Sequence, residues 1–267
     1  LFCANKTKQN ILDFINKFLY VDKNAAESIY DYFYEQFNYA EIHSHSRIIV
    51  EHYNDEKGKR KYVVFHTLYG RRVNDCLSRA VAFAIARTQH KDVEIGINDN
   101  GFYVASEKGI NVMQAFNLVK SKELRKILEM AIEHTEVLKR RFRHCATRAM
   151  MILRNYMGHQ KRVGRQQVSS MILLNAVRRI DTNFCILKEA RREVLEDLMD
   201  IENAAKVIEG VEEKKILIEE ITTSLPSPFA FNLILQGFTD LMKIEDKIEF
   251  VRRMHEQVMA KIKIEKN

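Results

Sequence analysis

Apolar residues recur at helical spacing at both ends of the chain, so helices are predicted there. Two of them lie near the start, at Lys8–Tyr20 and Ala25–Phe37. A third closes the chain at Glu245–Ile262, where the apolar residues share one face of the helix. Both terminal regions are therefore expected to be helical.

Between residues 41 and 106 the pattern changes to short runs rich in β-branched and aromatic residues, which favour strands. The predicted strands are, in order, Arg47–Tyr53, Lys61–Thr67, Val93–Ile97 and Phe102–Ala105. They form two hairpins, which are separated by a predicted helix at Val73–Arg87. The second hairpin turns at Asn98–Gly101, where the Asn-Gly pair predicts the positive φ angles of a tight turn.

From about Val112 the helical period returns and continues through most of the second half. The predicted helices there are Lys122–His134, Glu136–Tyr156, Arg165–Arg179, Lys188–Met199 and Ile201–Glu209. Met157–Gly164 is predicted to be a loop and Lys215–Ile221 a strand. Both prolines lie in Leu225–Phe229, which is expected to be an extended connector.

These elements together predict an α+β fold, in which a small strand-hairpin and helix subdomain is followed by a mostly α-helical subdomain. Three consecutive segments are expected. They are a helical segment at 1–40, an α+β subdomain at 41–110 and a mostly helical subdomain at 111–267.

Basic residues are concentrated in one stretch of this helical part. Between Lys139 and Arg179 the sequence has 11 basic residues and no Asp or Glu, while the rest of the chain has 32 basic and 36 acidic residues. That stretch accounts for the formal net charge of +7. Nine of the 11 are arginines, whose forked guanidinium groups suit phosphate contacts. A surface that binds a polyanion is therefore predicted.

A helical wheel gives Glu136–Tyr156 one apolar stripe and one cationic face. The predicted loop and the start of the next helix add cations beside glycines, which let a backbone approach a ligand closely. The predicted phosphate contacts in this stretch are Arg140, Arg143, Arg154, Lys161, Arg162 and Arg165. The alternative is that these arginines pair with the acidic block Glu189–Glu220, and a mixture of both is also open.

Two further candidate contacts, Arg71 and Arg72, follow Gly70 at a predicted strand-to-helix junction. A glycine there permits an unusual turn, and arginines at such a junction suit a phosphate. A helix start capped by Asn74 or Asp75, with both arginines simply exposed, explains the pattern equally well.

Motifs of a self-contained enzyme are absent from the sequence. It has no GxxxxGK[ST] phosphate loop, no GxGxxG after a strand and no GxSxG elbow, so no catalytic residue is predicted. Asp99 is expected to form a turn, with a catalytic role as the less common alternative.

The cysteines form no CxxC pair and the histidines lack zinc spacing, which favours reduced thiols in a cytoplasmic protein without a metal site. No apolar run is long enough to cross a bilayer, so no membrane partner is expected.

Several segments resemble the helicase-associated region of the large helicase-related (Lhr) proteins, in their archaeal branch. They are Ile48–Tyr53, Phe65–Asn74, Asn98–Phe102, Arg140–Arg143, Arg154–Tyr156, Val163–Gln167, Glu196–Asp200 and Ser227–Phe231. They include a strand ending in Val-Glu-x-aromatic, a Gly-x-x-Val-Asn turn into a helix and an Asp-x-Gly-Phe hairpin. The similarity follows the family's order from about residue 20 to 255.

The resemblance implies a C-terminal accessory module of an ATP-dependent superfamily 2 helicase that moves 3′ to 5′ along single-stranded nucleic acid. Residues 1–40 would be the helical end of a winged-helix-like region. The RecA-like domains, which bind ATP and Mg²⁺ in such helicases, have no counterpart in the sequence, so no cofactor is expected in this chain.

The expected partners are single-stranded or branched DNA or RNA, together with the helicase core. Two alternatives stay open, a protein-docking module and a DNA-repair enzyme of the glycosylase or lyase type.

Overall fold

The computed structural model describes residues 7–55, 60–160, 162–237 and 244–265, and the chain folds into two compact units. The sheet unit comprises Leu1–Leu68, Val93–Gly109 and Lys215–Asn267, and the helical unit comprises Tyr69–Asp92 and Ile110–Lys214. Each unit is assembled from separate stretches of the sequence. The units therefore do not follow the three consecutive segments predicted above.

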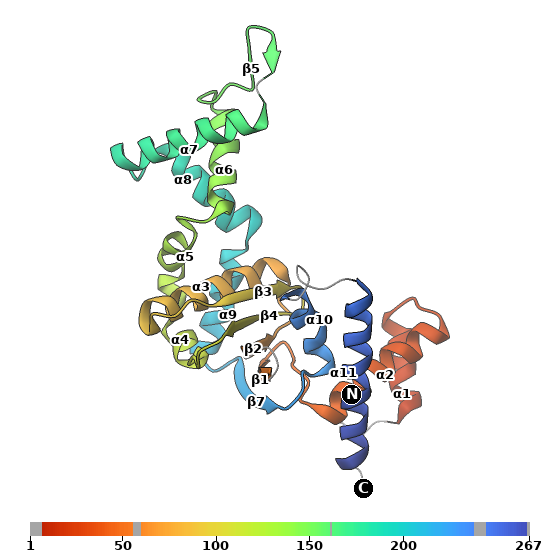
Figure 1. Cartoon of the computed structure of the whole chain (residues 1–267). Helices are drawn as coiled ribbons and strands as arrows, with labels where there is room; N and C mark the ends of the chain where they lie inside the picture. The colour runs from red at the N-terminus through yellow and green to blue at the C-terminus, as the bar shows by residue number, and fades with distance from the viewer. Residues whose placement is uncertain (1–6, 56–59, 161, 238–243, 266–267) are drawn as a thin grey trace. The chain divides into compact units, whose positions relative to one another are not determined.

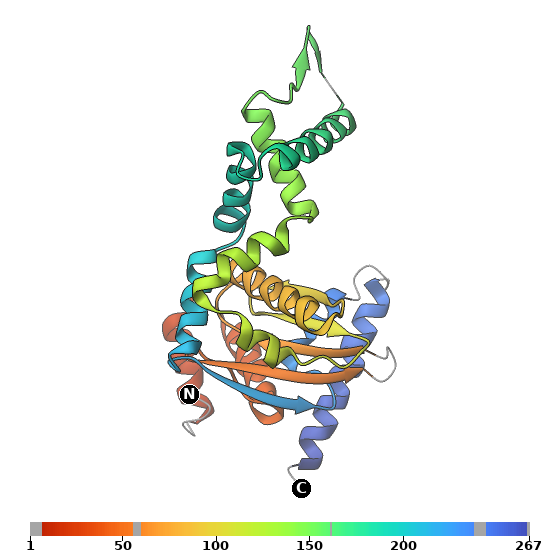
Figure 2. The ribbon, with the colours of Figure 1, turned by 90° about the vertical axis from the view of Figure 1, so that its left-hand side faces the viewer.

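The sheet unit is built on five strands in the order β3-β4-β2-β1-β7. Their bounds are β1 Arg47–Asp55, β2 Arg60–His66, β3 Glu94–Asn98, β4 Gly101–Ser106 and β7 Leu217–Thr223. Neighbouring strands are antiparallel, except that β7 runs parallel to β1 with Ile49 opposite Glu219. Figure 2 shows β7 beside β1 at the edge of the sheet. All five strands predicted from the sequence are present, and the α+β fold is confirmed.

Among the described residues, four helices complete the sheet unit, namely α1 Lys8–Phe18, α2 Lys23–Tyr39, α10 Pro228–Gly237 and α11 Ile244–Glu265. Asp22 begins α2 by accepting a hydrogen bond from the Ala25 N–H at 2.7 Å. Helix α10 was not predicted, because Pro226 and Pro228 at its start suggested an extended connector. Pro228 instead occupies the first turn of a helix, where a missing N–H costs nothing. Leu233 and Ile234 of α10 then pack on Tyr62 and Tyr103 of the sheet.

The second hairpin turns differently from the prediction. Asp99 and Asn100 form the turn without a positive φ angle, and the Asn98 carboxamide oxygen accepts a hydrogen bond from the Asn100 N–H at 2.8 Å. Gly101 is required for another reason. A Cβ atom at this position would lie 2.2 Å from the carbonyl oxygen of Phe65 on β2.

A buried carboxylate, Glu51 on β1, joins the sheet to the segment before α10. Its oxygens lie 2.8 Å from His66 Nε2 and 2.8 Å from the Thr223 hydroxyl, which donates to it. Ser227 donates both its backbone N–H and its hydroxyl, at 2.8 and 2.6 Å. His43 stacks on His66 at 5.7 Å between ring centroids. This network fixes the path of the chain from β7 into α10.

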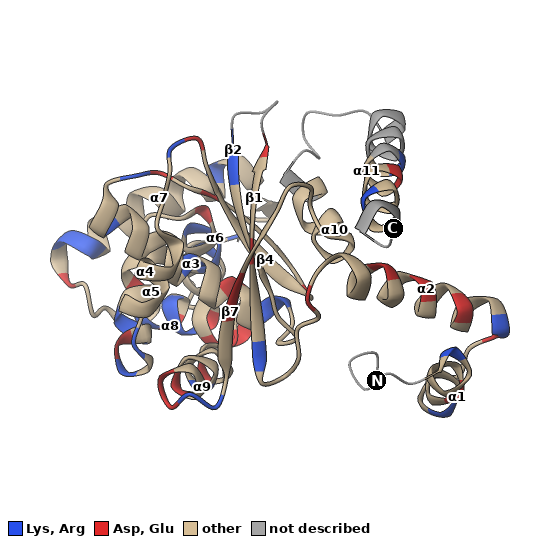
Figure 3. Ribbon diagram, turned by 90° about the horizontal axis from the view of Figure 1, so that it is seen from below, with Lys and Arg blue, Asp and Glu red and all other residues tan. Residues whose placement is uncertain are grey.

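Both α2 and β7 of the sheet unit contain acidic residues, whose positions on the ribbon are red in Figure 3. On β7, Glu219 accepts a hydrogen bond from Arg47 at 3.1 Å, and Glu220 lies 2.8 Å from His52 Nε2. The predicted phosphate contacts, by contrast, all belong to the helical unit.

The helical unit contains the basic stretch. Its elements are α3 Arg71–Gln89, α4 Val112–Leu118, the 3-10 turn η2 Ser121–Glu123, α5 Leu124–Ile132, α6 Glu136–Arg148, β5 Asn155–Tyr156, β6 His159–Gln160, α7 Val163–Ile180, α8 Cys185–Arg192, the π-helix η3 Glu193–Leu198 and α9 Ile201–Glu212. Helix α6 packs against both α7 and α8, and Figure 1 shows the β5–β6 hairpin beyond them.

Two predictions in this unit were wrong in extent. The helix predicted at Glu136–Tyr156 ends at Arg148 and is followed by the hairpin, part of which was predicted to be a loop. The helix predicted at Lys188–Met199 is the end of α8 followed by the π-helix η3.

Candidate nucleic-acid interface

The basic stretch begins on α6, whose sequence determines which side faces outward. Thr135 caps the helix by accepting a hydrogen bond from the Leu138 N–H at 3.4 Å. The buried residues of α6 are Leu138, Phe142, Cys145 and Ala146. Because these recur every three or four residues, Arg140 and His144 lie on the exposed side. The predicted apolar stripe is confirmed within the helix.

The end of α6 redirects the chain at a methionine. Met150 has a left-handed φ of 57°. Its N–H donates to the Thr147 carbonyl at 3.1 Å, and the Met151 N–H donates to the Ala146 carbonyl at 2.9 Å. This is a Schellman motif with methionine at the position that glycine usually occupies. Since no glycine marks it, the apolar period predicted a helix that continues.

The β5–β6 hairpin follows at once. Tyr156 is opposite His159 in the ladder, and Met157 and Gly158 form the connecting turn. Their φ angles of 48° and 77° are both positive, as a type I′ turn requires. The side chain of Met157 is 81% exposed.

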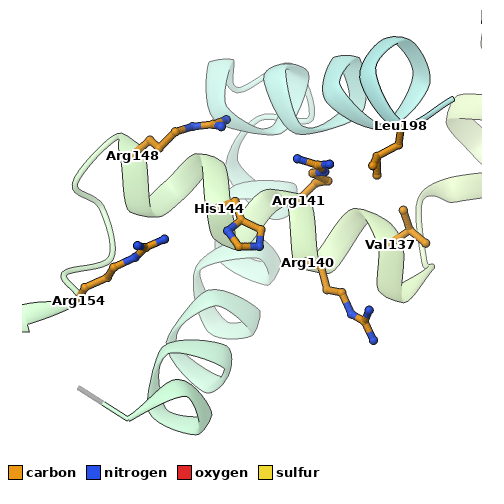
Figure 4. A pocket seen from close by; sticks show the side chains of 7 residues that line it. All are labelled: Val137, Arg140, Arg141, His144, Arg148, Arg154 and Leu198. Atoms are coloured by element: carbon orange, nitrogen blue, oxygen red, sulfur yellow. The ribbon is translucent and has the colours of Figure 1, made fainter. Parts of the chain in front are cut away.

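A pocket of about 550 Å³ opens along the cationic side of α6. The residues that line it are Val137, Arg140, Arg141, His144, Arg148, Arg154 and Leu198. Four of them are arginines, and none of the lining residues that the structure describes is a carboxylate. Figure 4 shows His144 among these arginines, with Arg154 reaching in from the segment after α6. The pocket therefore offers mainly hydrogen-bond donors and positive charge.

One buried carboxylate lies behind this pocket and holds two of its arginines. Glu193, at the start of η3, is 4% exposed and accepts hydrogen bonds from Arg148 and, at 3.5 Å, from Arg141. The predicted alternative of pairing with the acidic block is thus correct for these two arginines. Other cations of the stretch pair elsewhere, Lys139 with Glu136 at 2.6 Å for example.

Three predicted contacts keep their charge unpaired. Within the described part of the chain, the guanidinium groups of Arg140, Arg143 and Arg154 make no ion pair or hydrogen bond with the protein. Arg140 and Arg154 line the pocket, whereas Arg143 lies next to His144 on α6. Internal pairing therefore holds for some of these arginines, and phosphate binding by the unpaired ones stays a prediction.

His144 lines the pocket among its arginines, and their charges affect its pKa. Partial burial lowers its pKa, and the nearby charges of Arg143, Arg141, Arg154 and Arg148 lower it further. A histidine with a lowered pKa is neutral at pH 7. The arginine charges contribute to this shift after burial, and such a group of cations favours an anionic ligand.

Arg71 and Arg72 open α3 behind Gly70, whose φ is 81°. Arg72 donates hydrogen bonds to the backbone carbonyls of Glu196 and Met199, at 2.6 and 2.9 Å. Its guanidinium thereby caps the last turn of η3, a position where cations stabilise a helix end. Arg71 is exposed. The structure gives Arg72 a role in folding, and phosphate binding by either arginine stays a prediction.

The remaining predicted contacts lie at the start of α7. Arg162 and Arg165 are both exposed, and α7 has no acidic residue in its first turn and no side-chain cap. Lys161 lies outside the described residues. A helix start without an acidic residue leaves its N–H groups open to an external anion.

Among the nitrogen-bearing side chains of the pocket, sequence reasoning missed three, Arg141, His144 and Arg148. All three lie in the acid-free stretch, which was the available signal. Their convergence with Arg154 depends on the turn at Met150, which the helical period does not predict.

The described residues form no metal site, and neither Asp99 nor Cys76 is part of a recognisable catalytic arrangement. No group of histidine, cysteine and acidic residues in the described part of the chain is placed to hold a metal ion. Asp99 is exposed in the β3–β4 turn, and burial raises the pKa of the Cys76 thiol to about 12. Of the helices that the structure describes, none is long and apolar enough to span a membrane.

Comparison with known proteins identifies the family. Residues 42–230 match the DEAD/H associated family. The ATP-dependent helicase Lhr-Core of Methanothermobacter thermautotrophicus is 52% identical over 98% of this chain and 30% of its own length. The Saccharolobus solfataricus Lhr-Core is 39% identical over 95% of this chain and 30% of its own length. The chain thus spans about 30% of these curated relatives.

A solved structure agrees with these sequence matches. The structure of Mycobacterium smegmatis helicase Lhr bound to ssDNA and AMP-PNP superposes with a TM-score of 0.76 and 25% identity, over 85% of this chain and 29% of that one. The resemblance found in the sequence is therefore confirmed, and this chain belongs to the DEAD/H associated family, in the form that Lhr-type helicases contain.

Proposed function

We propose that this chain is a nucleic-acid-binding accessory module of an ATP-dependent Lhr-type helicase and grips single-stranded or branched DNA or RNA through its phosphates. The observation that carries the proposal is the pocket on α6, with four arginines and no carboxylate in its lining. ATP and Mg²⁺ are proposed to bind elsewhere in the helicase. The relative from Mycobacterium smegmatis was solved with ssDNA, which supports this class of ligand.

Phosphates suit this pocket better than base edges do. Arginine has five donors and no acceptor, so the lining matches the acceptor-only oxygens of a phosphate. Base edges present donors and acceptors together, and reading them requires acceptors that the lining largely lacks. Contacts of this kind fix the position of a strand without selecting its sequence.

The salt dependence of binding tests the proposal. Fluorescence polarisation with a labelled single-stranded oligonucleotide is measured at several salt concentrations. If Arg140 and Arg154, the two lining arginines that Glu193 does not bind, contact phosphates, the logarithm of the affinity falls with the logarithm of the salt concentration at a slope of about −1.4. A flat salt dependence contradicts phosphate binding.

Two variants locate the site. Arg140→Gln and Arg154→Gln each remove an unpaired pocket cation, so each is expected to weaken binding and to make the slope less negative by about 0.7. Arg87→Gln is the matched control, because it removes an exposed charge on α3 that does not line the pocket. Equal losses in all three variants would mean that only total charge matters.

A further inference from the structure

We propose that Met150 and Met157 form an apolar contact for unstacked nucleotide bases beside the arginine pocket. The proposal rests on the proposed function and adds a second kind of contact to it. The arginines hold phosphates, and the two methionines, placed before and after Arg154 in the sequence, pack against bases.

The backbone at both methionines is the first argument. Met150 and Met157 have φ angles of 57° and 48°, in the left-handed region. That region is unfavourable for an ordinary L-residue, because its Cβ comes too close to the following carbonyl oxygen. Glycine suits the helix end at Met150, and asparagine suits the first position of the type I′ turn at Met157. Local structure therefore disfavours methionine at both positions.

Packing within the chain offers no compensation. The side chain of Met150 is 77% exposed and that of Met157 is 81% exposed. Met151 and Leu153, in the same segment, are 42% and 40% exposed. Large apolar side chains held at unfavourable backbone positions and left in water indicate contact with something outside the described chain.

The neighbouring charges indicate what that partner is. Arg154 lies in the segment between the two methionines and has no protein partner among the described residues, and it lines a pocket without carboxylates. A ligand that meets both features must be anionic and also present apolar surfaces. Single-stranded nucleic acid has both properties, since its bases are free to leave the stack. Methionine is among the apolar side chains that insert between bases.

Met157→Asn is the test variant, because Asn-Gly is the preferred pair for this turn and the hairpin is kept. Its affinity for a single-stranded oligonucleotide is expected to fall about five-fold, with an unchanged salt slope because no charge is lost. Met130→Gln, which alters an exposed methionine on α5, is the matched control and is expected to bind like the parent chain.

An abasic oligonucleotide of the same length and charge isolates the base contact. The parent chain is expected to bind it more weakly than the intact strand, and Met157→Asn is expected to cause no further loss. An equal loss on both strands, or none on the intact strand, would overturn the base contact. Absence of salt-dependent binding by the parent chain would instead overturn the proposed function, so the two failures are distinguishable.

Discussion

Glu193 shows how one residue sets the charge available in the pocket. It is buried, and it binds Arg141 and Arg148, which are 29% and 58% exposed. Replacing it with glutamine, as Glu193→Gln, removes a negative charge behind two lining residues. The affinity for single-stranded nucleic acid is expected to rise, with the salt slope steeper by up to about 0.7 for each arginine that gains a phosphate. Salt-titrated fluorescence polarisation measures both quantities.

The same substitution is expected to reduce the free energy of unfolding by about 1–3 kcal/mol, since charged hydrogen bonds to a buried group are lost. Urea unfolding measures this loss. Glu212→Gln is the control, because Glu212 pairs with Lys120 and lies outside the pocket. If both variants bind alike, Glu193 does not restrain the pocket.

Single elements were predictable where a local signal exists. Helix α3 and the strands of both hairpins follow from their periods, and α1 and α2 are correct to within a few residues. The end of α6 was not predictable, because Met150 takes the left-handed position without the glycine that usually signals it. The π-helix η3 likewise has no periodic signature that separates it from α8.

Met150→Gly, at the end of α6, is expected to change stability and nucleic-acid affinity in opposite directions. Glycine adopts a left-handed φ without strain, so the Schellman motif is expected to gain up to about 1 kcal/mol, less the larger entropy of glycine in the unfolded chain. Affinity for single-stranded nucleic acid is expected to fall, because an exposed apolar side chain is removed. Thermal unfolding and fluorescence polarisation measure the two effects. A variant that gains stability and binds unchanged would restrict the base contact to Met157.

At the scale of the whole molecule, the sequence predicts the strands but not which of them pair. The parallel pairing of β7 with β1 joins residues that lie 170 positions apart, as for Arg47 and Leu217. No local pattern encodes a contact over that separation, which is why three consecutive segments were expected. The pocket also depends on contacts between residues that are far apart in the sequence, because α6, the segment after it and η3 come together only in the folded unit.

The Glu51 network makes the stability of the whole chain depend on pH. Burial, together with the charges of His66 and Arg47, lowers the pKa of His43 from 6.5 to about 4. Burial alone would raise the pKa of Glu51, but hydrogen bonds from His66 and Ser227 outweigh it and lower the pKa. The folded state thus binds fewer protons than the unfolded state at both residues. Stability is therefore lost as the pH falls, first from 6.5 towards 4 through His43 and then below 4.5 through Glu51.

His43→Phe separates these two steps. An aromatic ring remains against His66 and Phe229, whose centroids lie 5.7 and 5.8 Å from that of His43, but the titrating group is removed. Urea unfolding at a series of pH values is expected to show the parent chain losing about 1–3 kcal/mol between pH 6.5 and 4. The variant is expected to lose less stability over that range, because His43 no longer titrates and only groups such as His144, whose pKa is also lowered, still do. Below about pH 4.5 both proteins are expected to lose stability, because the folded state lowers the pKa of Glu51. Identical profiles for the two proteins would show that His43 is protonated as readily in the folded chain as in the unfolded one.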